Sequence, residues 1–167
     1  MIKDIDRKKI WTDFHCHCLP GIDDGAKNPE IASEMLKRLK KQGIDKVVAT
    51  PHYYPFEESI SSFLERRQRA YETLRRALTD EMPEIVLGAE VLLKNDISSE
   101  DLSPLCIEGT SIIMAELPWP RSTYWLAGEL ETILYSRRLI PMIAHIDRYV
   151  LSYTKESLDD ILSLENI

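Results

Sequence analysis

Cysteine is scarce in this sequence of 167 residues, which contains three, and two of them, Cys16 and Cys18, are separated by a single residue. An odd number of cysteines, two of them so close together, argues against a framework of disulfide bonds and favours a cytoplasmic protein. No apolar run approaches the roughly 18 residues that a membrane-spanning helix needs. The N-terminal residues also lack the apolar core of a signal peptide. We therefore expect no membrane insertion.

Basic residues are also in deficit. The sequence has 21 Lys and Arg against 28 Asp and Glu, so its formal net charge is −7. A protein that binds nucleic acid without sequence preference needs a basic surface, and we expect no nucleic-acid partner. The 44% hydrophobic and 29% charged residues are typical of a globular protein. Because internal repeats and Gly/Ser linkers are absent, we expect residues 1–167 to form a single domain.

Short apolar runs alternate with longer amphipathic stretches. Each run is rich in Ile and Val and is bounded by turn residues, which predicts a buried parallel strand. The predicted strands are residues 10–19, 46–52, 85–93, 111–117 and 139–145. About five strand–helix units in a row predict an α/β fold with a parallel sheet, as a barrel or an open sheet. A complete eightfold barrel usually needs about 250 residues, more than this chain has.

The helix after the first strand has clear end signals. Asn28 precedes Pro29 as an N-cap, and Gly43 marks the C-terminal end. Its predicted apolar face consists of Ile31, Met35, Leu36 and Leu39. A second amphipathic helix is predicted within residues 59–80.

All four histidines and two glutamates fall late in, or at the end of, a predicted strand. They are His15, His17, His52, Glu90, Glu116 and His145. The carboxyl ends of parallel strands meet at one edge of a sheet, where α/β proteins build their sites. Since strand side chains alternate between faces, His15 and His17 are expected to point the same way and to chelate one metal ion. The alternative is a pair of histidines bound to backbone or solvent.

Asp23 and Asp24 lie between glycines directly after the first strand. They form either a plain turn or, beside the histidine pair, a source of one metal ligand. Imidazoles and carboxylates together suit Zn, Mn or Fe, and the cluster is large enough for two ions. We expect Cys16 and Cys18 to be small core residues. Thiol-based phosphatases have an arginine six residues after the catalytic cysteine. None of the three cysteines here has an arginine at that position, so nucleophilic cysteine catalysis is disfavoured.

Arg148 follows His145 by three residues. Beside a metal cluster its guanidinium suits bidentate phosphate binding, and the alternative is an ordinary surface arginine. We interpret the other basic runs, at residues 37–41, 66–69, 75–76 and 137–138, as solvated helix faces.

Five sequence blocks resemble the PHP-domain phosphoesterases. They read Asp-Phe-His-Cys-His-Cys-Leu-Pro-Gly-Ile-Asp-Asp-Gly-Ala-Lys at residues 13–27, Ala-Thr-Pro-His-Tyr at 49–53, Gly-Ala-Glu at 88–90, Glu-Leu-Pro at 116–118 and Ala-His at 144–145. Their order and spacing are most similar to the bacterial manganese-dependent protein-tyrosine phosphatases of capsular and exopolysaccharide operons.

The resemblance implies a distorted (β/α)7 TIM-like barrel and a PHP-type metal site. It implies metal ligation by His15, His17, Asp24, His52, Glu90, Glu116 and His145, with Glu90 bridging. Arg148 would hold the phosphate and, with Asp24, form the catalytic pair. The cofactor would be about two to three Mn ions, with Fe or Zn as alternatives. The reaction implied is attack of a metal-bound hydroxide on the phosphorus of phosphotyrosine, carried on a bacterial tyrosine kinase of polysaccharide export.

Two departures from the family pattern matter. Ile146 and Asp147 replace the usual Pro-Glu between His145 and Arg148. The late Asp-x-His pair that completes the family's metal cluster is missing, as are the last strands of the barrel. We therefore expect a domain truncated at its C-terminal end, either a fragment or a short form that closes its sheet by homo-oligomerisation. The alternative functions are a small-molecule phosphatase of the histidinol-phosphate type and a non-catalytic remnant that binds a partner.

Overall fold

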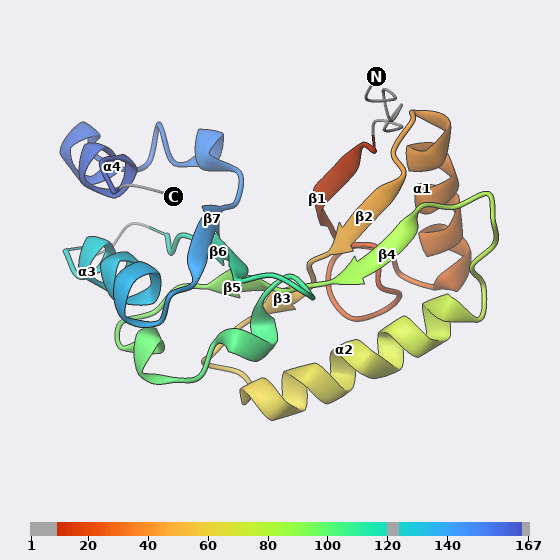
Figure 1. Cartoon of the computed structure of the whole chain (residues 1–167), viewed down its shortest axis with the longest axis horizontal. Helices are drawn as coiled ribbons and strands as arrows, with labels where there is room; N and C mark the ends of the chain where they lie inside the picture. Colours follow the sequence, from red (N-terminus) through yellow and green to blue (C-terminus); the bar gives the residue numbers. More distant parts are fainter. Residues whose placement is uncertain (1–9, 120–123, 165–167) are drawn as a thin grey trace, which may run out of the picture.

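The computed structural model describes residues 10–119 and 124–164, which form two parallel sheets flanked by helices (Figure 1). The first sheet has the order β1-β2-β4, and the second has the order β3-β5-β6-β7. The strands of the first sheet are β1 (Thr12–Cys16), β2 (Lys46–Ala49) and β4 (Glu84–Leu87). Those of the second are β3 (His52–Tyr53), β5 (Glu90–Leu92), β6 (Ile112–Glu116) and β7 (Ile140–Ile143). The prediction of an α/β fold with parallel strands is confirmed.

The prediction of about five strands is wrong, because two apolar runs each bend into two strands. The run at residues 46–52 divides into β2 and β3 at Thr50 and Pro51, and the run at 85–93 divides into β4 and β5 at Gly88 and Ala89. Pro51 has no N–H to give to a neighbouring strand. At Gly88 an added Cβ would lie 3.2 Å from Cγ1 of Val48, so the two neighbouring strands approach each other closely near this bend. Each bent strand therefore leaves the first sheet and continues in the second.

α-Helices flank the two sheets (Figure 1). They are α1 (Pro29–Lys41), α2 (Ile60–Arg75), α3 (Leu126–Glu131) and α4 (Lys155–Leu162). A π-helical turn, η3 (Thr132–Ser136), extends α3, and the 3-10 turns are η1 (Ile97–Ser99), η2 (Ser103–Leu105) and η4 (Ile146–Arg148). In Figure 1, α1 lies beside the first sheet and α3 and α4 lie beside the second. Among the described residues, no helix has the length and apolarity to cross a bilayer.

Helix α1 begins as its sequence predicts. The side chain of Asn28 accepts a hydrogen bond of 2.9 Å from the backbone N–H of Ile31, and Pro29 occupies the first turn. Gly43 follows the helix with a φ of 94°, a conformation that favours glycine. Of the predicted apolar face, Leu36 is fully buried, but Ile31 is 40% exposed.

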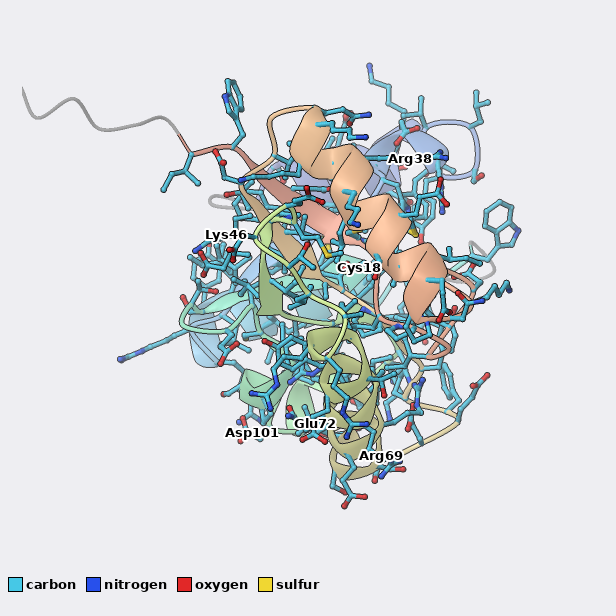
Figure 2. All side chains as sticks on the ribbon, turned by 90° about the vertical axis from the view of Figure 1, so that its right-hand side faces the viewer. Cys18, Arg38, Lys46, Arg69, Glu72 and Asp101 are labelled. Carbon is cyan, nitrogen blue, oxygen red and sulfur yellow. The ribbon has the colours of Figure 1, made fainter. Side chains whose placement is uncertain are left out.

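Two apolar cores stabilise the fold, one between the first sheet and α1 and the other between the second sheet and α3 and α4. Leu36 of α1 packs with Cys16 and Cys18 in the first core, and both cysteines are free thiols as expected of small core residues. Figure 2 looks onto α1 and α2, with Cys18 behind α1 and Arg38 on its outer side. Helix α2 contributes Leu74 to the first core and Phe63 to the second, and so joins the two.

We expect Leu36→Ala to lower the free energy of unfolding by about 2 to 5 kcal/mol, because it removes buried methyl groups and leaves a cavity. Ile31→Ala, in the same helix but half exposed, is the matched control and should cost less than about 1 kcal/mol. Urea unfolding followed by circular dichroism measures both values. Equal losses in the two variants would contradict the assignment of this core.

Candidate metal centre

His15 and His17 bring two imidazoles to one side of β1. Their Nε2 atoms lie 3.4 Å apart, while Cys16 and Cys18 face the core, as strand alternation predicts. The hydroxyl of Thr50 accepts the backbone N–H of Cys16 and lies 3.1 Å from Nδ1 of His15. With Nδ1 as the donor to Thr50, the Nε2 lone pair of His15 is free to face a cation.

Asp23 orients the second imidazole, a role that sequence reasoning missed. Its Oδ2 lies 2.8 Å from Nδ1 of His17 and also accepts the backbone N–H of His52, while its Oδ1 accepts the N–H of Gly25. Burial alone would raise the pKa of Asp23, but these hydrogen bonds outweigh it and hold that pKa below its usual range. A carboxylate behind a metal-binding histidine is the usual second layer of such sites. The sequence contains one signal for this role of Asp23, namely its position next to Asp24 and directly after the histidine pair.

Glu90 lies at the centre of the imidazoles and is fully buried. Its Oε2 is 3.1 Å from Nε2 of His17, 3.2 Å from Nδ1 of His52 and 3.6 Å from Nε2 of His15. Its Oε1 lies 2.8 Å from Nε2 of His145. The structure thus brings together all four histidines around one carboxylate, and we call these five residues the Glu90 cluster.

Two further acids flank the Glu90 cluster. Oε2 of Glu116, at the end of β6, lies 3.6 Å from Nδ1 of His52. Oδ1 of Asp24 lies 3.7 Å from Nε2 of the same imidazole, and the Asp24 side chain is 82% exposed. Every residue predicted from the sequence to bind metal therefore lies in or beside the cluster, with Asp24 at its solvent side.

The Glu90 cluster and Glu116 contain buried polar atoms that make no well-formed hydrogen bond among the described residues, although two of these atoms, Nδ1 of His52 and Oε2 of Glu90, lie 3.2 Å apart. The full set is Nδ1 of His52, Oε2 of Glu90, Oε2 of Glu116 and Nδ1 of His145. A buried polar atom without a partner costs free energy, so such atoms point to a group that satisfies them. Three sets of side chains have ligand atoms within 4.8 Å of one another: His15–Glu90–His145, His17–Asp24–His52 and His52–Glu90–Glu116. These nitrogen and oxygen donors fit divalent transition metals such as Mn, Fe or Zn.

The charges of the cluster also favour a cation. Burial disfavours the charged imidazole of His17, but the carboxylates of Asp23 and Glu90 outweigh it and raise the pKa of His17 to about 10. Burial and the negative charge of Glu90 raise the pKa of Glu116 above its ordinary value. Both shifts draw protons to atoms that face the centre, and a divalent cation would compete with those protons for the same sites.

Two cavities open beside the cluster. One of about 460 Å³ is lined by Asp24, His52, Tyr54 and Arg66 among others. The other, of about 260 Å³, is lined by Glu116, His145 and Arg148. Arg148 is exposed, belongs to η4 and lines the second cavity, and its positive charge acts to lower the pKa of Glu116.

Two arginines of α2 hold loops near the site, which corrects their interpretation as a solvated face. Arg66 donates to the carbonyl of Ile22 and to the carboxylate of Glu58. Arg67 donates to the carbonyl of Gly88 at 2.8 Å. The two carbonyl acceptors, of Ile22 and Gly88, lie 44 and 21 residues away in the sequence, and periodicity within the helix does not reveal such contacts.

The sequence matches the family described as "Capsular polysaccharide synthesis, CpsB/CapC" over residues 11–166. Tyrosine-protein phosphatase YwqE of Bacillus subtilis is 31% identical over 144 residues, which cover 81% of this chain and 54% of that protein. Putative tyrosine-protein phosphatase CapC of Staphylococcus aureus is 30% identical over 147 residues, covering 82% and 54%. This chain spans about half the length of the curated relatives it matches.

A solved structure supports the fold. A chain from the crystal structures of YwqE from Bacillus subtilis and CpsB from Streptococcus pneumoniae, described as unique metal-dependent tyrosine phosphatases, aligns with a TM-score of 0.67. The sequence identity is 24%, and the alignment covers 82% of this chain and 56% of that chain.

Gly25 is the residue whose size controls the position of His17. A Cβ at Gly25 would lie 2.2 Å from the carbonyl oxygen of His17 and 2.4 Å from its Cβ, so the backbone has to shift. We expect Gly25→Ala to weaken Mn²⁺ binding by about 10- to 100-fold, as loss of an orienting partner does, measured by isothermal titration calorimetry.

Gly128→Ala is the control for this variant. Gly128 lies in α3 with no atom within 4 Å of its added Cβ, and alanine favours a helix. We expect its Mn²⁺ affinity to be unchanged. Equal affinity in the Gly25 and Gly128 variants would contradict the proposed link between Gly25 and the cluster.

Proposed function

The chain belongs to the CpsB/CapC family of capsular polysaccharide synthesis, and from that premise we propose that it is a metal-dependent phosphoesterase that hydrolyses phosphotyrosine. The observation that carries the proposal is the Glu90 cluster, four imidazoles around one fully buried carboxylate, with buried polar atoms that make no well-formed hydrogen bond among the described residues. The relatives named as tyrosine-protein phosphatases support the choice of phosphotyrosine.

We propose a shared ligand set for the metal ions. Its members are His15, His17, Asp24, His52, Glu90, Glu116 and His145, with Glu90 bridging. Mn is the proposed metal, and Fe and Zn are alternatives because the same donors bind all three. When bound, the ions would lower the pKa of a water molecule and neutralise charge on the phosphoryl group.

The protein's own residues supply orientation, charge and proton transfer. Asp23 fixes the tautomer of His17, so that Nε2 faces the centre. Arg148 stands at the mouth of the smaller cavity, where its guanidinium would bind two phosphoryl oxygens and stabilise the charge that develops on them. Asp24, exposed beside His52, would accept the proton of the attacking water at Oδ1.

The finer architecture and setting are part of the proposal. We interpret the two parallel sheets as part of a distorted (β/α)7 barrel within one PHP-like domain, whose outer strands β1 and β7 would pair with further strands or with a second copy. The proposed partner is a bacterial tyrosine kinase of polysaccharide export in the cytoplasm. The family's description and the relatives' names as tyrosine-protein phosphatases support the proposal of this partner.

We expect His52→Ala to lower Mn²⁺-dependent phosphate release from a phosphotyrosine peptide by more than about 100-fold. Loss of a residue that only hydrogen-bonds to a metal ligand already lowers metal affinity or activity by about 10- to 100-fold, and His52 is itself a proposed ligand. His52 contacts Glu90, Glu116 and Asp24, so its loss affects two of the three ligand sets. A malachite green assay measures release. Glu72→Gln, on the exposed face of α2 (Figure 2), is the control and should retain full activity.

Activity that survives His52→Ala would mean that phosphate is released elsewhere. Histidinol phosphate, tested beside the peptide at equal concentration, separates a small-molecule phosphatase from a protein phosphatase. We expect turnover of the peptide to be the faster of the two.

Arg148→Lys tests the phosphate-binding role. Lysine keeps the charge but not the planar fork, so we expect KM for the phosphotyrosine peptide to rise about tenfold with a smaller change in kcat. Steady-state kinetics gives both constants. Arg69→Lys, on the exposed side of α2 and labelled in Figure 2, should match the unmodified protein. An unchanged KM in Arg148→Lys would show that Arg148 does not bind the phosphate.

A further inference from the structure

The smaller cavity carries more aromatic surface than phosphate binding needs. Besides Glu116, His145 and Arg148, it is lined by Tyr54, Trp119 and Tyr149. Cationic groups are sufficient to bind a phosphate, and imidazoles and carboxylates are sufficient to bind its metal ions. Exposed aromatic side chains at a binding cavity, by contrast, are suited to an apolar, planar part of a ligand.

Trp119 is a large exposed side chain on an anchored segment. Its side chain is 74% exposed, although tryptophan is usually covered in folded proteins. The two residues before it are fixed by tyrosines from beyond β7. The hydroxyl of Tyr149 accepts the N–H of Leu117 at 3.1 Å, and the hydroxyl of Tyr153 donates to the carbonyl of Pro118. The indole is therefore held at the cavity by its backbone while its ring stays accessible.

Tyr54 provides the second aromatic surface. Its ring stacks on the imidazole of His52 with centroids 5.0 Å apart and an interplanar angle of 18°. It lines both cavities, so it lies at the boundary between them.

We propose that Trp119 and Tyr54 form an aromatic slot that takes the aryl ring of an aryl phosphate monoester while Arg148 takes its phosphate. The proposal rests on the phosphoesterase function proposed above and assigns the residues that select tyrosine over serine. The charge of Arg148 complements the phosphate, and the neutral aromatic surfaces complement the ring. A phosphoserine side chain has no ring, so it would leave Trp119 exposed and gain nothing from the slot.

Binding of two phosphonates that are not hydrolysed tests the slot. We expect the Mn²⁺-loaded chain to bind phenylphosphonate about tenfold more tightly than methylphosphonate, the range that aromatic contacts provide. Trp119→Ala should abolish this preference, and Trp119→Phe should retain most of it. Tyr135→Ala removes another aromatic side chain, 59% exposed and outside the smaller cavity, and should leave the preference unchanged. Calorimetry measures the affinities.

Either of two results overturns the slot: equal affinity of the unmodified chain for both phosphonates, or an equal loss of both in Trp119→Ala. Hydrolysis of a phosphotyrosine peptide separates this proposal from the function on which it rests. If the phenyl preference depends on Trp119 but no phosphate is released, the slot stands and the phosphatase function fails. If phosphotyrosine is hydrolysed and the preference does not depend on Trp119, only the slot fails.

Discussion

The buried carboxylate of Glu90 is the constraint on which the rest of the structure depends. An uncompensated charge with no solvent exposure costs several kcal/mol, so its surroundings have to supply positive charge. Four imidazoles approach it from three regions of the chain, and polar atoms among them still lack a partner. Imidazoles alone therefore satisfy the site incompletely, and a divalent cation is the group that matches the atoms left over.

The bends between β2 and β3 and between β4 and β5 bring this cluster together. Because both strands bend at the same level, His52 and Glu90 start the neighbouring strands β3 and β5 and pair directly in register. In a straight strand, alternation alone would have set the direction of each side chain. The break at Pro51 and Gly88 instead turns the following residues toward β1, where His15 and His17 lie. A local break in the sheet thus brings the proposed metal ligands together.

The sequence predicted the residues of the cluster better than it predicted their support. Strand ends are visible as apolar runs, and chemistry-bearing residues at those ends indicate one shared edge. Asp23, Arg66 and Tyr149 were missed because each acts through a hydrogen bond to another element, up to 44 residues away. The strand bends were missed for a similar reason, since the contact of Gly88 with Val48 exists only after the strands have paired.

The backbone at His145 is strained at the point where this residue joins the Glu90 cluster. Its φ of 32° and ψ of 53° lie in the left-handed region, which is unfavourable for a residue with a side chain. The conformation places Nε2 at 2.8 Å from Glu90 and starts η4, which carries Arg148. A relaxed backbone would continue the direction of β7 and separate the imidazole from the carboxylate. The strain therefore links two roles of one turn, contact with the buried charge and presentation of Arg148, which we propose binds the phosphate.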